Sequence, residues 1–187
     1  MPPPEARQSP TNHLVDRREA LIARLRTHIA ADEREEADRC AMLRFAAELD
    51  DPLARTQAGA HFTASAFVVD PAGEHACLVA HAKLGRLLQP GGHVEASDAS
   101  LEDAALREAR EETGLDLRLH PTAPRPFDLD CHEIPPQEGE PAHTHLDVRF
   151  LLVGEGEPLA GAAWYALGEA ADGSVARLAA KARALAD

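Results

Sequence analysis

The sequence is poor in the features that mark secreted and membrane proteins. Its 187 residues include three cysteines, Cys40, Cys77 and Cys131, and no two of them form a CxxC pair. This odd, scattered set argues against a disulfide framework or a cysteine-based structural zinc site. No apolar run approaches the roughly 20 residues that cross a bilayer. Met1–Glu5 lacks the basic and apolar regions of a secretory signal. We therefore expect a cytoplasmic protein with no membrane partner.

Positive charge is scarce as well. Lys and Arg number 19 against 32 Asp and Glu, which gives a formal net charge of -13. Such a surface repels nucleic acid, so we expect no nucleic-acid polymer as a partner. It would also repel a small anionic substrate unless cations intervene, which is a first indication that divalent metal matters.

The N-terminal third has a helical pattern. Residues 1–12 are rich in proline and polar residues, and we expect them to be loosely held. Apolar residues then recur at three- and four-residue steps from His13 to Leu49, which predicts two helices. Asp32 with Glu35 resembles a helix start, and Asp51-Pro52 a helix end. We expect residues 1–55 to form a helical extension, either a packing appendage or an element for dimerisation or substrate closure, so that a homodimer is possible.

Residues 56–187 read as a separate domain of mixed strands and helices. The expected helices lie at 100–113 and 174–185, and a short extended piece lies at 86–89. The expected strands lie at 61–69, 75–81, 115–120, 127–134 and 145–153, the first two forming a hairpin. This order predicts an α+β fold, with helices layered on a sheet.

The helix at 100–113 carries an unusual group of acids. Glu108, Glu111 and Glu112 fall within an arc of about 100°, next to a face with Ala105 and Ala109 that suits close packing on a sheet. The i,i+4 like charges of Glu108 and Glu112 disfavour the helix. A solvated acidic face is one interpretation. The other is a metal site, because magnesium takes one or two carboxylates and leaves positions for water and phosphate.

The segment around this helix resembles the signature of the Nudix hydrolase family. The sequence Gly92-x5-Asp98-x8-Arg107-Glu-Ala-Arg-Glu-Glu-Thr-Gly-Leu115 is similar to G-x5-E-x7-R-E-U-x-E-E-x-G-U, where U is apolar. Asp98 stands where the family has Glu, and one extra residue separates it from Arg107. The resemblance covers about His61 to Leu167 and implies a Nudix-like α/β/α sandwich with a mixed sheet.

The resemblance also implies a site and a reaction. Mg²⁺ or Mn²⁺ would be held by four groups: the carboxylates of Glu108, Glu111 and Glu112 and the carbonyl of Gly92. Arg107 would orient Glu111, and Gly91-Gly92 would let the backbone approach the phosphates. The implied reaction is water attack on phosphorus in a small-molecule diphosphate, such as a nucleoside diphosphate linked to another moiety, with a carboxylate accepting the proton.

Further candidates lie outside the signature. Lys83 and Arg86 precede the Gly-Gly loop and contact phosphate or a leaving group, or serve solubility. His143 and His145 alternate with Asp147 and Arg149 along one strand, and His61 alternates with Thr63 and Ser65 along another. The first set either contacts substrate or a metal or forms a solvated sheet face, and the second either lines a pocket or forms a polar sheet face.

Two other functions share the same fold. One is a catalytically silent binding module, which the intact Glu108, Glu111 and Glu112 disfavour. The other is an isomerase of isoprenoid diphosphates, for which the sequence shows no suitably placed cysteine and glutamate.

Overall fold

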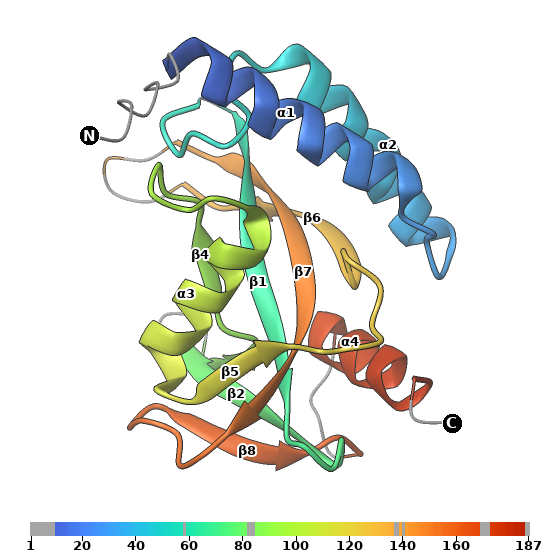
Figure 1. Ribbon diagram of the computed structural model, residues 1–187, viewed down its shortest axis with the longest axis vertical. Coiled ribbons are helices and arrows are strands. Elements are labelled where there is room, and N and C mark those ends of the chain that lie inside the picture. The colour runs from blue at the N-terminus through green and yellow to red at the C-terminus, as the bar shows by residue number, and fades with distance from the viewer. Residues whose placement is uncertain are drawn as a thin grey trace, which may run out of the picture.

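A mixed eight-stranded sheet forms the centre of the protein, with helices on both faces (Figure 1). The computed structural model describes residues 10–57, 59–81, 85–136, 139, 141–168 and 173–185. Within them the strands are β1 (Ala60–Val69), β2 (His75–His81), β3 (Arg86–Leu88), β4 (Gly91–His93), β5 (Asp116–Leu119), β6 (Asp128–Ile134), β7 (His143–Glu155) and β8 (Ala162–Ala166).

The strand order makes β1 and β7 the central pair. They run parallel, with His61 opposite His145 and Ser65 opposite Arg149. Their other neighbours are antiparallel: β2 and β4 on β1, and β5 and β6 on β7. Strand β2 continues the sheet to β3 and β8. The predicted α+β class, mixed sheet and hairpin of β1 with β2 are confirmed.

Four helices are described, and their ends follow local capping rules. They are α1 (Pro10–Thr27), α2 (Glu33–Glu48), α3 (Leu101–Thr113) and α4 (Gly173–Arg183). Asp32 caps α2 by accepting a hydrogen bond from the Glu35 N–H. Ser100 caps α3 in the same way, and Gly114 ends α3 with a φ of 69° in the left-handed region. The predicted starts of α2 and α3 are therefore confirmed.

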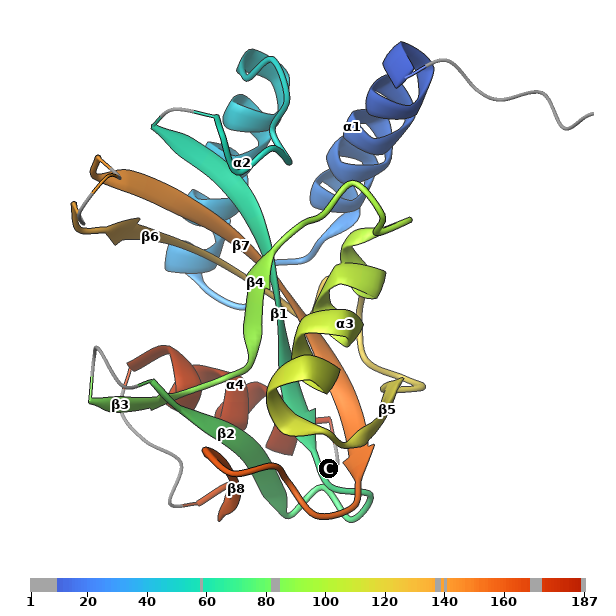
Figure 2. The same ribbon diagram turned by 90° about the vertical axis from the view of Figure 1, so that its left-hand side faces the viewer.

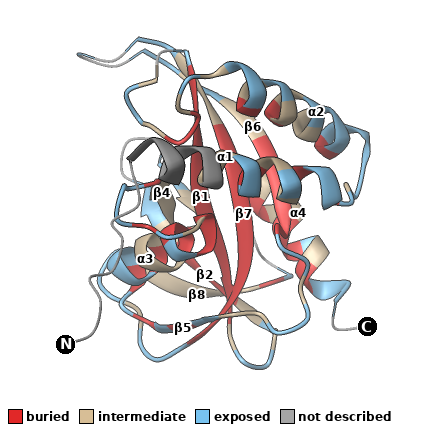
Figure 3. Cartoon of the chain, turned by 45° about the horizontal axis from the view of Figure 1, so that its top comes forward, coloured by how far each residue is buried: buried red, intermediate tan, exposed pale blue. Residues whose placement is uncertain are grey.

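The two sheet faces bury different sets of side chains. Along β1, Phe62 and Ala64 point into a core shared with α1, α2 and α3. Phe67 and Val69 point to the opposite face, where α4 covers them. Strand β1 is therefore buried on both faces, and Figure 3 shows β1 and β7 as the buried centre of the molecule. Figure 2 shows α3 lying beside β1 and β4, so the signature helix packs on the sheet face at the central strand β1, next to β4.

Two strands were not anticipated from the sequence. Strand β4 includes the Gly-Gly pair and lies against β1, with Gly92 opposite Ala64. Strand β8 includes Trp164 and Tyr165. It pairs with β2. No described helix is long and apolar enough to cross a membrane.

Candidate active site

Helix α3 presents its acids to one side and its alanines to the other. Ala105 and Ala109 are fully buried against the sheet. Glu108 is half-buried, and Glu111 and Glu112 are exposed. The helix therefore packs on its small residues and leaves the three glutamates on an accessible face, as the periodicity predicted.

Strand β4 brings backbone atoms against two of these glutamates. A Cβ atom on Gly92 would lie 2.6 Å from Cδ of Glu108 and 2.7 Å from each of its carboxylate oxygens. The Gly91 N–H donates a hydrogen bond of 3.1 Å to Oε2 of Glu112. A Cβ on Gly91 would collide with Ser65 of β1. Glycine is thus required at Gly91, where a Cβ would meet Ser65 and the backbone of β1, and at Gly92 any side chain would displace the Glu108 carboxylate from the strand.

Arg107 connects the start of the signature to its centre. Its Nε and Nη2 donate to the two oxygens of Asp98 at 3.0 and 2.9 Å, a bidentate pair. Its Nη2 also donates to the His93 carbonyl at 2.9 Å. Its Nη1 lies 2.8 Å from Glu108 but 3.6 Å from Glu111, so the geometry ties Arg107 more closely to Glu108. Asp98 also accepts the Glu95 N–H and therefore orders the loop before α3.

The pKa values reflect this arrangement. Burial opposes ionisation of Asp98, but the hydrogen bonds from Arg107 and Glu95 outweigh it and hold its pKa below the ordinary value. The hydrogen bond to Asp98 raises the pKa of Arg107. Withdrawal of water around the carboxylate raises the pKa of Glu112, and the charges of Glu108 and Glu111 add to this effect. The site thus concentrates negative charge that a cation would stabilise.

The donors at this site suit a hard divalent cation. Glu108 and Glu112 supply carboxylate oxygens beside the backbone of Gly92 and Gly91, at a place where a Cβ would fill the space. Magnesium and manganese prefer oxygen ligands of this kind and retain positions for water and phosphate oxygens. The residues present therefore fit the metal that the signature implies.

The opposite side of β4 carries a group of histidines that the sequence resolved only in part. His61 of β1, His93 of β4 and His145 of β7 each place a ring nitrogen within 4.8 Å of the others. His143 stacks on His61, with ring centroids 5.1 Å apart, and His132 lies edge-on to His145 at 5.6 Å. We call these five residues the histidine face. His93 was missed, although its place directly after Gly91-Gly92 was the available signal.

The histidine face is partly withdrawn from water. Burial, together with the neighbouring His93 and His143, lowers the pKa of His61 to about 4. Burial and the neighbouring His61 and His132 lower the pKa of His145 to about 3. Both rings are therefore neutral at pH 7. Neither ring nitrogen of the buried His61 has a hydrogen-bond partner among the described residues.

Below the histidine face, the same side of the sheet holds a buried ionic network. Asp147 accepts hydrogen bonds from Thr63, Ser65 and Arg149, at 3.0, 2.6 and 2.8 Å. Arg149 also donates to Asp128 and Asp130 of β6. The possibility of a solvated sheet face is wrong for Asp147 and Arg149, which are 4% and 1% exposed. Thr63 and Ser65 are buried as well, so the polar sheet face to which they belong lies in the interior.

The network extends to the N-terminal and C-terminal helices. Glu35 of α2 is fully buried and pairs with His28 at 2.8 Å and with Lys181 of α4 at 2.9 Å. Lys181 also binds Asp128, and Arg177 of α4 binds Asp128 and Asp130. These bonds join segments up to 146 residues apart in the chain. Because of them, α2 and α4 are tied to the same two strands.

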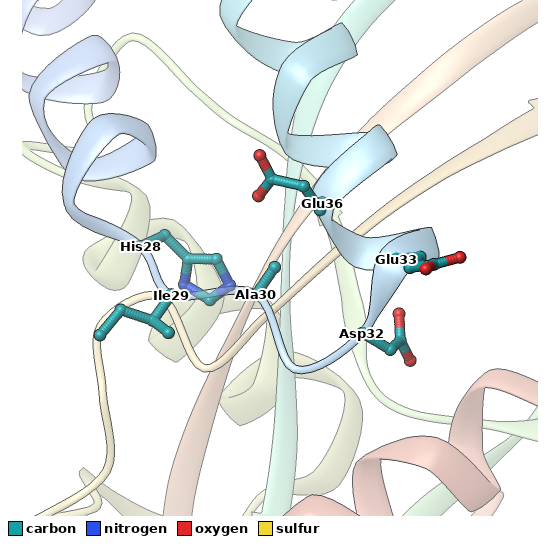
Figure 4. A pocket seen from close by; sticks show the side chains of 6 residues that line it. All are labelled: His28, Ile29, Ala30, Asp32, Glu33 and Glu36. Atoms are coloured by element: carbon teal, nitrogen blue, oxygen red, sulfur yellow. The ribbon is translucent and has the colours of Figure 1, made fainter.

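The remaining candidates lie apart from these groups or outside the described residues. Arg86 is exposed at the start of β3 and forms no ion pair with another described residue. Lys83 lies outside the described residues. A surface hollow at the turn between α1 and α2 is lined by His28, Ile29, Ala30, Asp32, Glu33 and Glu36 (Figure 4). None of these six belongs to α3 or β4, so the hollow is separate from the candidate active site.

The fold and the glutamate-bearing helix behind a Gly-Gly strand define a class of hydrolase, and comparison with known proteins agrees. A family model described as NUDIX domain matches residues 59–185. This chain therefore belongs to the Nudix family, and it is a pyrophosphohydrolase of that type. Among curated proteins, none matches the sequence significantly.

Solved structures share the fold at low sequence identity. A NUDIX-family hydrolase from Clostridium perfringens is 23% identical with a TM-score of 0.54, over 68% of this chain and 98% of that one. An Ap4A hydrolase from C. elegans is 17% identical with a TM-score of 0.49, over 67% and 98%. A UDP-X diphosphatase is 21% identical with a TM-score of 0.46, over 95% and 97%. Only the first has a TM-score above 0.5, and at 23% identity it supports the fold alone.

Proposed function

We propose that this protein is a divalent-metal-dependent hydrolase that cleaves the diphosphate linkage of a nucleoside diphosphate linked to another moiety, or of a related organic pyrophosphate. The observation that carries the proposal is the contact between β4 and α3. There the backbone of Gly91 and Gly92 lies directly against the carboxylates of Glu112 and Glu108. An anionic diphosphate approaching this backbone would meet acids, so a cation must lie between them.

The metal ligands in this proposal are Glu108, Glu111, Glu112 and the Gly92 carbonyl. Mg²⁺ or Mn²⁺, when bound, neutralises charge on the diphosphate oxygens and acidifies the attacking water. Glu111 and Glu112 are the accessible carboxylates of the set, and one of them accepts the proton of that water. Arg107 holds Glu108 in place through its bidentate anchor on Asp98.

The small-molecule substrate would lie along β4. Gly91 and Gly92 permit close approach of the phosphates, because neither carries a side chain. His143 and His145 are half-buried on the opposite side of the sheet and are our candidates for contact with the rest of the substrate. His61 is buried, so its part in substrate binding would act through its ring contacts with these two histidines. Arg86 is also assigned to substrate binding, because it lies at the start of β3, shortly before the Gly-Gly pair in the chain.

A phosphate-release screen across diphosphate compounds, with Mg²⁺ and with Mn²⁺, tests the proposal. Nucleotide sugars, ADP-ribose, dinucleoside polyphosphates and dNTPs should be included. We expect release from at least one class, complete loss on exhaustive chelation, and recovery on adding metal. With ¹⁸O-labelled water, the label should appear on a phosphate product, because water attacks phosphorus.

Glu155→Gln is the matched control for charge removal in these assays. Glu155 ends β7, is 60% exposed at its side chain like Glu111, and pairs only with Arg118 at the surface. It should retain wild-type activity. Undiminished turnover after chelation would refute the metal requirement. Release from no compound, with tight binding of one of them, would favour a silent binding module.

A further inference from the structure

Strand β4 separates two groups of potential ligands. Gly92 faces the glutamates of α3, while the next residue, His93, pairs with Thr63 and so points to the opposite face of the sheet. His61 lies two residues from Thr63 on that same face, and its parallel partner on β7 is His145. The registers of three strands therefore bring three imidazoles together from positions far apart in the sequence.

The three imidazoles converge on a common point. One nitrogen from each of His61, His93 and His145 lies within 4.8 Å of the others. Ring centroids are 4.9 to 5.3 Å apart among the three. His61 is only 3% exposed, and neither of its nitrogens has a hydrogen-bond partner in the described structure. A buried imidazole whose nitrogens lack a partner is rare, and the ring of His61 lies 4.9 to 5.1 Å, centroid to centroid, from those of His93, His143 and His145.

We propose that His61, His93 and His145 form a binding site for a transition-metal dication of the zinc class, distinct from the glutamate site on α3. Imidazole nitrogen suits zinc, cobalt, nickel, iron and copper, whereas magnesium prefers the oxygens on the other side of β4. Three histidines are a sufficient protein ligand set for such an ion and leave a further position open. The inference depends on the strand registers and not on the proposed function.

His143 supports the site from beside it. Its Nδ1 lies 3.0 Å from the Pro141 carbonyl, which can only accept, so Nδ1 carries the proton. The unprotonated Nε2 then points toward Nε2 of His145, 3.2 Å away. Donation of the other ring N–H to a backbone carbonyl is a usual way in which a ligating histidine is oriented. His143 is thus placed as a fourth ligand or as a neighbour that orients His145.

The site also has a charge consequence. Three neutral ligands leave the double positive charge of the ion uncompensated, in contrast with a cation held by three carboxylates. An ion here would therefore bind an anion or water in its open position.

Titration of the metal-free, full-length protein with Co²⁺ tests this inference directly. We expect one tight equivalent with visible ligand-field absorption, displaced by Zn²⁺ and unaffected by a large excess of Mg²⁺. His93→Ala and His145→Ala should each weaken Co²⁺ binding at least a hundredfold. His61 is not chosen for this purpose because it is buried, and its replacement would test folding as well.

Two variants serve as matched controls. His132→Ala removes a histidine of the same face whose Nδ1 is committed to Asp130 at 3.0 Å, and it should bind Co²⁺ as the wild type does. Glu112→Gln alters only the glutamate site and should also retain the absorption. Circular dichroism of the metal-free variants establishes that each is folded, and His145→Gln replaces His145→Ala if the latter is not.

The outcomes separate the two sites. Loss of the absorption in Glu112→Gln, with retention in His93→Ala and His145→Ala, would overturn the inference, because the ion would then occupy the glutamates. Absence of any tight Co²⁺ equivalent in the wild type would overturn it as well. Failure of the phosphate-release screen would leave the histidine result unaffected, so the two proposals fail independently.

Discussion

Two groups of carboxylates in this protein differ in how their charge is balanced. The first is buried and contains Glu35, Asp128, Asp130 and Asp147, which contact four cationic side chains: Arg34, Arg149, Arg177 and Lys181. The second lies on α3 and contains Glu108, Glu111 and Glu112. Arg107 is the one cation paired with it among the described residues, and Arg107 is shared with Asp98.

We call the buried set the balanced group and the set on α3 the unbalanced group. The difference in charge balance indicates what each group can do. In the buried group, acids and bases match in number, and hydrogen bonds occupy most carboxylate oxygens. Removing one member of such a group lowers the stability of the fold, because it leaves the partner's charge buried without compensation. On α3 the excess of acid is exposed and disfavours the helix slightly, so its retention points to a ligand that supplies the missing positive charge. Sequence composition alone does not distinguish the two groups.

The largest effect is expected when a charge is removed from the unbalanced group. Glu112→Gln keeps the shape and leaves an amide oxygen to accept the Gly91 N–H. We expect turnover to fall about a thousandfold, equivalent to about 4 kcal/mol of transition-state stabilisation. The melting temperature should not fall, because a like-charge i,i+4 contact with Glu108 is relieved. Steady-state kinetics in saturating Mg²⁺ and a thermal melt measure both. Wild-type turnover would show that Glu112 is not an essential metal ligand and would overturn its place in the proposed site.

Removing a carboxylate from the balanced group should have the opposite effect: stability should fall while turnover is kept. Glu35→Ala leaves the buried His28 without its carboxylate partner, Lys181 with Asp128 as its remaining ion-pair partner among the described residues, and the Leu129 N–H without its acceptor. We expect the free energy of unfolding to fall by about 3 kcal/mol, with unchanged turnover at temperatures where the variant is folded. Urea unfolding measures the loss. Glu36→Ala, which removes an exposed neighbour paired only within α2, should have a much smaller effect. Equal losses would mean that the network does not stabilise the fold.

The balanced group should also respond to acid. Burial opposes ionisation of Glu35, but hydrogen bonds from His28, Lys181 and Ala31 lower its pKa from 4.5 to about 2. A carboxyl with a depressed folded pKa contributes stability that is complete above its unfolded pKa and is lost as the pH falls toward the folded one. The window for Glu35 is therefore about pH 4.5 down to 2, and the contribution about 2 kcal/mol after discounting for its coupled partners.

Comparison of the wild type with Glu35→Gln isolates this contribution. Unfolding in urea at pH 6, 4.5 and 3 should show a difference in stability that is largest at pH 6 and shrinks toward pH 3. Other carboxyls, such as Asp130, titrate in both proteins and cancel in the difference. A difference independent of pH would indicate that folding does not lower the pKa of Glu35, and a difference that grows toward pH 3 would indicate that folding raises it.

Much of the unbalanced group could be predicted, because its information is local. The periodicity of α3, its caps at Ser100 and Gly114 and the order of its glutamates all lie within one segment. Strand β4 was missed because three residues have no period to detect. His93 was missed with it, since the direction of its side chain follows from pairing with Thr63 rather than from its neighbours.

The balanced group could not be predicted for the opposite reason. The alternation of His143 to Arg149 correctly placed those side chains on one face, but whether that face is wet depends on what covers it. Helix α4 covers this face. Its Lys181 binds Asp128 of β6 and also Glu35 of α2, which is 146 residues away in the sequence. No local pattern in Arg177 or Lys181 marks them as buried ion-pair partners. The extent of the N-terminal extension as a separate unit stays a prediction.

The smallest predicted effect sharpens the comparison at the backbone. In Gly92→Ala the new Cβ would lie 2.6 Å from Cδ of Glu108, so that carboxylate must swing away. Glu108 is only half-buried, so its carboxylate can turn toward solvent, and stability should change little. The carboxylate would then lie away from its place beside β4, and we expect turnover to fall about tenfold, roughly 1.4 kcal/mol, with a higher Mg²⁺ requirement. Gly168→Ala is the matched control, because a Cβ there meets nothing within 4 Å. If Gly92→Ala keeps full activity at limiting Mg²⁺, the metal does not bridge β4 and α3, and the unbalanced charge on α3 needs another explanation.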